Sequence, residues 1–145
     1  MFERLFPRRA PAPEPLPQPN PQLALGALLV RVAFADNTYR ASEIGQIDRI
    51  LAQTFQIGPI EAAKLRAVCE KLEHDAPDTP EFARILREEV DYAHRLALGK
   101  AMWAVALADG HRHEKEEIQL YEIETALGLT ETDIEALRRE ATGER

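Results

Sequence analysis

The chain has 145 residues, a net charge of −7, 45% hydrophobic residues and a single cysteine, Cys69. One cysteine excludes a disulfide framework and a paired-cysteine metal site, and the thiol is expected to be a small buried hydrophobe. The length suits one domain, and the acidic balance disfavours nucleic acid as a partner while favouring cations or basic proteins.

A proline-rich segment opens the chain. Seven of the ten prolines lie between Pro7 and Pro21, where they remove backbone donors and hold the chain extended. We predict a flexible tail over residues 1–20 and one helical domain over residues 21–145. The opening sequence MFERLFPRR suits either one amphipathic turn that contacts a protein partner or a membrane surface, or a tail without such a role.

No secretory signal is recognisable in this tail, because it lacks a long apolar core and a cleavage site of small residues. We therefore expect a cytoplasmic protein. If the tail binds lipid, the protein would be peripheral to the inner face of the membrane.

Helix signals divide the remaining chain into about seven segments. Asn20 and Pro21 form a cap followed by a first-turn proline, Gly58-Pro59 repeats this signal, and Ser42 is a plausible cap for the second helix. The expected helices cover about residues 21–35, 42–55, 59–74, 79–89, 91–109, 114–126 and 130–142, with residues 90–94 read either as a break or as a continuation. No segment alternates with a period of two, so no β-sheet is expected.

Two of these helices contain copies of one segment. LALGALLVRVAFAD (Leu23–Asp36) and LALGKAMWAVALAD (Leu96–Asp109) match at 8 of 14 positions at an offset of 73, where chance would give roughly two. Both are almost wholly apolar, yet they fall short of the about 20 residues that cross a bilayer. The duplication predicts an all-α fold with two pseudo-symmetric halves around two central apolar helices.

Each copy ends in an aspartate that a glutamate follows seven residues later, Asp36 with Glu43 and Asp109 with Glu116. An aspartate at a helix carboxyl end opposes the helix dipole by up to about 1 kcal/mol. One explanation is structural: the aspartates accept amide hydrogen bonds from the turns that follow. The other is a site, in which the two turns meet and four carboxylates offer oxygen ligands to Mg²⁺, Ca²⁺ or Mn²⁺.

Two histidines, His111 and His113, follow the second aspartate. They either bind Zn²⁺ or Ni²⁺ together with Asp109 or belong to a solvated loop, and the first copy has Thr38 and Arg40 at their positions. The chain contains no recognisable nucleophile arrangement and no glycine-rich phosphate loop. We therefore expect a protein that is not an enzyme.

The duplicated motif resembles that of the TerB-like family, which is named for bacterial tellurite resistance. The resemblance covers Leu23 to about Thr142 and is clearest in ALADGHRHEKEEI, Ala106–Ile118. It implies an all-helical fold with two pseudo-symmetric halves, and a metal-binding module of stress-response or membrane-associated complexes. The acidic positions of the family fall on four residues of this chain: Asp36, Glu43, Asp109 and Glu116.

The first copy departs from the family pattern. Asn37 stands where glycine is usual, and Tyr39 and Arg40 stand in a loop that is often acidic. A positive charge at Arg40 is expected to lower the cation affinity of that half. The predicted function is a non-enzymatic helical module that binds a divalent cation or a basic protein partner through its acidic turns. The alternative is a structural interaction domain, recruited by its N-terminal tail, whose aspartates only cap turns and bind no metal.

Overall fold

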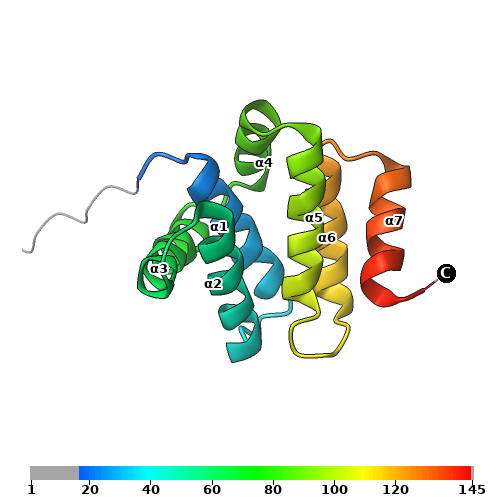
Figure 1. The fold of residues 1–145 in the computed structure, drawn as a ribbon, viewed down its shortest axis with the longest axis horizontal. Helices are drawn as coiled ribbons and strands as arrows, with labels where there is room; N and C mark the ends of the chain where they lie inside the picture. Colours follow the sequence, from blue (N-terminus) through cyan, green and yellow to red (C-terminus); the bar gives the residue numbers. More distant parts are fainter. Residues whose placement is uncertain (1–16, 145) are drawn as a thin grey trace, which may run out of the picture.

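The computed structural model describes residues 17–144, which form seven α-helices and contain no β-strand (Figure 1). The helices are α1 Pro21–Ala33, α2 Ala41–Phe55, α3 Pro59–Asp75, α4 Thr79–Glu89, α5 Tyr92–Ala106, α6 Glu114–Ala126 and α7 Glu131–Thr142. The prediction of an all-helical fold is confirmed. Residues 1–16 of the predicted tail lie outside the described part, so the division into tail and domain stays a prediction.

Two similar halves make up the fold. Helices α1–α3 lie on one side and α5–α7 on the other, and α4 crosses at one end (Figure 1). The two copies of the apolar segment, in α1 and α5, pack against each other, as the duplication predicted. None of the described helices combines the length and the apolarity needed to cross a membrane.

The two central helices differ in how far they are enclosed. In α1, ten of 13 residues are buried, because α2, α3, α4, α5 and α6 all pack against it. In α5, only Gly99, Met102, Trp103, Val105 and Ala106 are buried. The two apolar helices pack against each other as predicted, but α1 is buried on most sides whereas one side of α5 is exposed.

Two helix starts need more than a sequence signal to explain them. The N-cap of α2 is Arg40 and not Ser42, because the Glu43 carboxylate accepts the Arg40 backbone N–H at 3.0 Å, as in the return bond of a capping box. Val90 is extended and separates α4 from α5, and Asp91 caps α5. Of the segment over residues 90–94, only residues 90–91 form a break, and residues 92–94 belong to the first turn of α5.

Glycines at matching positions allow close helix packing in both halves. A Cβ at Gly26 would lie 2.2 Å from the Cys69 sulfur, and a Cβ at Gly99 would lie 2.7 Å from Leu137 Cδ1. The missing side chains let α1 approach α3 and α5 approach α7. Cys69 is fully buried, as predicted.

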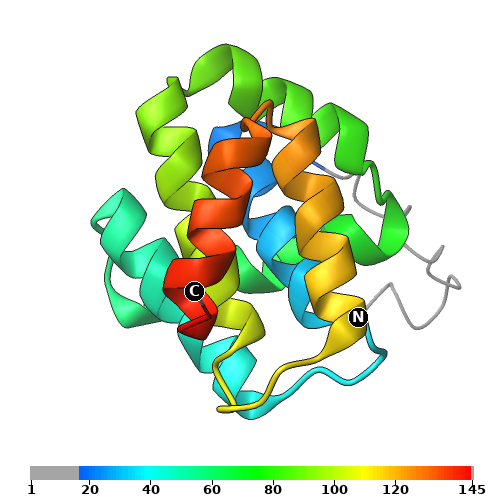
Figure 2. The same ribbon diagram turned by 90° about the vertical axis from the view of Figure 1, so that its right-hand side faces the viewer.

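The loops that follow α1 and α5 lie side by side at the end of the molecule opposite α4 (Figure 2). Asn37 and Gly110 occupy equivalent positions in these loops, and both adopt the left-handed conformation, with φ of 64° and 81°. The helices themselves end earlier, with Phe34 and Leu107 as their C-caps, and the left-handed residue three positions later turns the chain back toward α2 or α6. The two aspartates that the sequence singles out are thereby brought to the same end.

Candidate functional site

Four carboxylates converge where the two halves meet at this end. Asp36 and Asp109 lie in the loops after α1 and α5, while Glu43 and Glu116 lie in the first turns of α2 and α6. These are the four residues that the sequence singles out, and we call them the acidic centre. All four contact one guanidinium group, which belongs to Arg40.

The contacts of Arg40 span both halves. Its Nη2 lies 2.9 Å from Asp36 Oδ2, its Nη1 lies 3.4 Å from Glu43 Oε1 and 3.7 Å from Glu116 Oε1, and its Nε lies 3.2 Å from Asp109 Oδ2. The sequence predicted an electrostatic effect of Arg40 on its own half. It did not predict contact with the second half, because nothing local connects residue 40 to residues 109 and 116.

His113, which belongs to the second half, contacts the aspartates of both halves. Its Nε2 lies 2.8 Å from Asp109 Oδ2, and its Nδ1 lies 3.7 Å from Asp36 Oδ2. His111 is exposed, as a solvated loop would predict, but the imidazole of His113 is partly buried in the acidic centre. The sequence did contain a signal for the role of His113, because residue 113 is equivalent to residue 40 at the offset of 73.

Each aspartate uses its two oxygens differently. Asp36 Oδ1 accepts the backbone N–H of Thr38 at 3.1 Å, and Asp109 Oδ1 accepts that of His111 at 3.0 Å, so the predicted turn-forming hydrogen bonds exist. The Oδ2 atoms face Arg40. Burial opposes ionisation of both groups, but the hydrogen bonds from side chains and backbone outweigh it, and the pKa of each aspartate is lowered.

The two glutamates are the buried part of the acidic centre. Glu43 is 1% exposed and Glu116 is 0% exposed. Glu43 Oε2 and both carboxylate oxygens of Glu116 have no hydrogen-bond partner among the described residues, and the 3.7 Å contact with Arg40 is too long to be one. Burial raises the pKa of Glu116, and the neighbouring Glu43 carboxyl group raises it further, through a hydrogen bond that only a protonated Glu116 can make and through charge repulsion. Unpartnered buried oxygens are rare in proteins and call for an explanation.

The donor chemistry of the acidic centre fits a divalent cation, because carboxylate oxygens are the ligands of Mg²⁺, Ca²⁺ and Mn²⁺. Within residues 17–144, however, no three Asp, Glu, His or Cys side chains lie in an arrangement that would hold a metal ion as they stand. The Arg40 guanidinium lies among the carboxylate oxygens instead. A metal ion would need these side chains to move.

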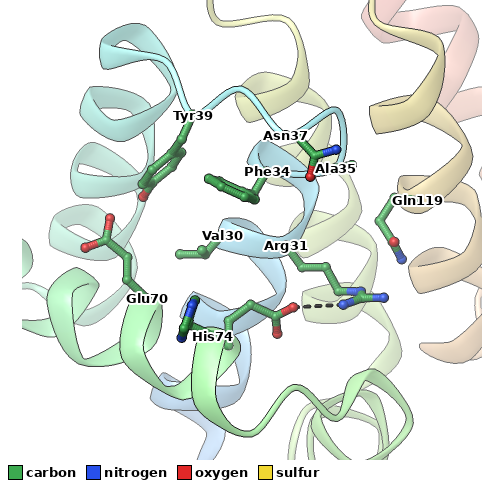
Figure 3. Close-up of a pocket in the computed structure, with 10 residues that line it drawn as sticks. Val30, Arg31, Phe34, Ala35, Asn37, Tyr39, Glu70, His74 and Gln119 are labelled. Atoms are coloured by element: carbon green, nitrogen blue, oxygen red, sulfur yellow. Dashed lines mark hydrogen bonds and ion pairs between the residues drawn. The ribbon is translucent and has the colours of Figure 1, made fainter.

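A cavity of about 510 Å³ lies on another side of the loop that carries Asp36. Phe34 and Tyr39 line it with their rings edge to face at 5.8 Å, beside Val30 and the ion pair of Arg31 with Glu73 (Figure 3). Phe34 is 48% exposed. The sequence did not predict this cavity, because Phe34 belongs to an apolar run that is typical of a core helix.

The sequence model described as tellurite resistance protein TerB matches residues 22–139 of this chain. The chain belongs to the TerB family. The matched region contains both copies of the apolar segment and all four carboxylates of the acidic centre, so the family assignment made from the motif is confirmed. Comparison with curated proteins and with solved structures found no significant match.

Proposed function

We propose that this TerB-family chain is a non-enzymatic helical module whose acidic centre binds a divalent cation, Mg²⁺, Ca²⁺ or Mn²⁺. The observation that supports this most is the set of unpartnered oxygens on Glu43 and Glu116. Burying an ionised carboxylate without a partner costs several kcal/mol or forces the group to keep a proton. A divalent cation would supply the missing partner to both glutamates.

The charges of the acidic centre support the same proposal. Four ionised carboxylates carry four negative charges, and Arg40 offsets one of them, with a second offset when His113 is protonated. The remaining excess is two or three negative charges when all four are ionised, and one or two when Glu116 keeps the proton that its raised pKa favours. One divalent cation would remove most of it, and the field of such an ion would in turn favour the ionised form of Glu116.

Calorimetric titration of the full chain with Mg²⁺, Ca²⁺, Mn²⁺ and Zn²⁺ tests the proposal, with Glu116→Gln as the decisive variant. We expect one of the first three ions to bind below millimolar concentration. Glu116→Gln should weaken that binding at least about tenfold, because removing even a hydrogen-bond partner of a metal ligand typically weakens binding by about 10- to 100-fold. Asp36→Asn and Asp109→Asn should also weaken it.

The matched control is Glu124→Gln. Glu124 lies on the same helix as Glu116, is 1% exposed and also has an unpartnered oxygen, but it is not part of the acidic centre. We expect this variant to bind the cation as the wild type does. If no ion binds below millimolar concentration, or if the two variants lose affinity equally, the cation-binding proposal is wrong.

The second candidate is a protein interaction domain that binds no metal. The cavity beside Phe34 and Tyr39, with its half-exposed aromatic surface, supports this candidate. Here Arg40 and a proton on Glu116 would stabilise the acidic centre as a purely structural element. The N-terminal tail, residues 1–20, would bind either a protein partner in the cytoplasm or the inner face of the membrane. A titration without any cation binding would favour this candidate.

A further inference from the structure

Arg40 contacts carboxylates from both halves of the molecule. It belongs to the first half of the molecule, yet its Nε reaches Asp109 and its Nη1 approaches Glu116, both in the second half. The same group contacts Asp36 and Glu43. One side chain therefore lies against all four carboxylates that would ligate a cation.

The oxygens that Arg40 contacts are the ones that a cation would need. Asp36 and Asp109 each use Oδ1 to accept a hydrogen bond within a turn, whereas both Oδ2 atoms face away from the turns and contact the guanidinium. A cation bound to these atoms would place its charge beside that of Arg40 at contact distance, where like charges repel strongly in a partly buried site. A divalent cation would therefore compete with the Arg40 guanidinium for these oxygens.

Arginine has no neutral form that would let it stay in place. Its guanidinium keeps its charge at any pH at which proteins are folded, so it can yield the carboxylates only by moving. The side chain is 24% exposed, which leaves it a direct route into solvent. The backbone N–H of Arg40 donates to Glu43 Oε1, the same oxygen that its Nη1 contacts.

We propose that Arg40 is the built-in cation of the acidic centre and that it exchanges with a divalent ion for the same four carboxylates. This inference rests on the proposed function and adds the residue that sets its affinity. Arg40 stabilises the cation-free state and raises the ion concentration that is needed to fill the site. Both states contain a cation among the carboxylates, one internal and one bound from solution.

Titration of Arg40→Gln with Mn²⁺, Mg²⁺ and Ca²⁺ tests the exchange. Glutamine keeps a polar side chain and removes the charge, so we expect the ion to bind at least about tenfold more tightly than it binds the wild type. In the absence of divalent ions the melting temperature of the variant should be lower than that of the wild type. A saturating ion should then raise the melting temperature more in the variant than in the wild type.

Arg66→Gln is the matched control. This substitution changes the net charge by the same amount as Arg40→Gln. The Arg66 side chain is 19% exposed, and it pairs with Asp48 and Glu70 rather than with the acidic centre. We expect the ion to bind this variant as it binds the wild type. Equal tightening in the two variants would show a general effect of net charge and would overturn the proposal for Arg40.

The outcomes separate this inference from the proposed function. If the wild type binds an ion and Arg40→Gln binds it no more tightly, the exchange is wrong and cation binding stands. If neither protein binds an ion, both are wrong. Should Arg40→Gln fail to fold, Arg40→Lys decides, because one ammonium group cannot contact four carboxylates at once. Its affinity should exceed that of the wild type, and an unchanged affinity would overturn the proposal.

Discussion

Glu124 shows how one buried carboxyl group distinguishes the two halves. It occupies the position equivalent to Leu51 at the offset of 73, and both side chains lie near the matching glycine of the central helix, Gly99 or Gly26. Leu51 is an apolar side chain and is buried without needing a hydrogen bond. The Glu124 carboxyl group is also buried, but one of its oxygens has no hydrogen-bond partner. Burial, together with the charge of Glu131, raises the pKa of Glu124 to about 8.

The raised pKa of Glu124 predicts a loss of stability with rising pH. The folded chain keeps a proton on Glu124 that the unfolded chain releases near its ordinary pKa of 4.5, so this contribution to the free energy of unfolding is largest at low pH. It decreases between about pH 4.5 and 8, by about 1.4 kcal/mol for each unit by which the pKa differs between the two states. Chemical denaturation of Glu124→Gln across this range should show a flatter profile than the wild type.

The exposed residue Glu122 on the same helix provides the control. Glu122→Gln should keep the pH profile of the wild type. If Glu124→Gln and the wild type lose stability in parallel as the pH rises, Glu124 does not hold a proton in the folded protein.

Among the helices, the packing of α1 on α3 and of α5 on α7 depends on a glycine at the same place in each half. The two contacts differ in what a methyl group would meet. At Gly26 it would meet the short side chain of Cys69, which can move only with α3, and at Gly99 it would meet the flexible end of Leu137. The α1–α3 contact is therefore the less tolerant of the two.

Alanine substitutions test this difference. We expect Gly26→Ala to lower the free energy of unfolding by about 1 to 3 kcal/mol, because overpacking a core displaces its neighbours, and Gly99→Ala to lower it by less. Gly45→Ala is the control: a Cβ there would be 3.6 Å from Arg49, so the better helix propensity of alanine should raise stability by up to about 1 kcal/mol. Urea denaturation measures all three, and a neutral Gly26→Ala would contradict the prediction.

At the scale of the whole molecule, charged side chains of one half contact those of the other in the acidic centre. Arg40 pairs with Asp109, and His113 approaches Asp36, so each half contributes a cationic position to the aspartate of the other. The duplication explains this reciprocity, since residues 40 and 113 are equivalent. The acidic centre therefore links the halves at the end opposite α4.

A double-mutant cycle between Arg40 and Asp109 measures this link. Combining Arg40→Gln with Asp109→Asn in the absence of divalent ions should give a coupling of about 0.5 to 3 kcal/mol in the free energy of unfolding, as for contacting residues in one network. The exposed pair of Arg84 and Glu88 within α4 should give only about 0.3 to 0.5 kcal/mol. A coupling for Arg40 and Asp109 no larger than this would contradict the structural link.

The helices, the duplication and the four carboxylates of the acidic centre could all be recognised in the amino-acid sequence. Caps, prolines and apolar periodicity act within one turn of helix, so most helix ends could be predicted, and a repeat is visible without knowledge of the fold. Tertiary packing explains why α1 is enclosed while α5 is not, and why the N-cap of α2 is Arg40. It also explains why Glu43 and Glu116 are buried beside a guanidinium from one half. Those features depend on how distant segments pack, and burial and contact across the two halves leave no periodic signal in the chain.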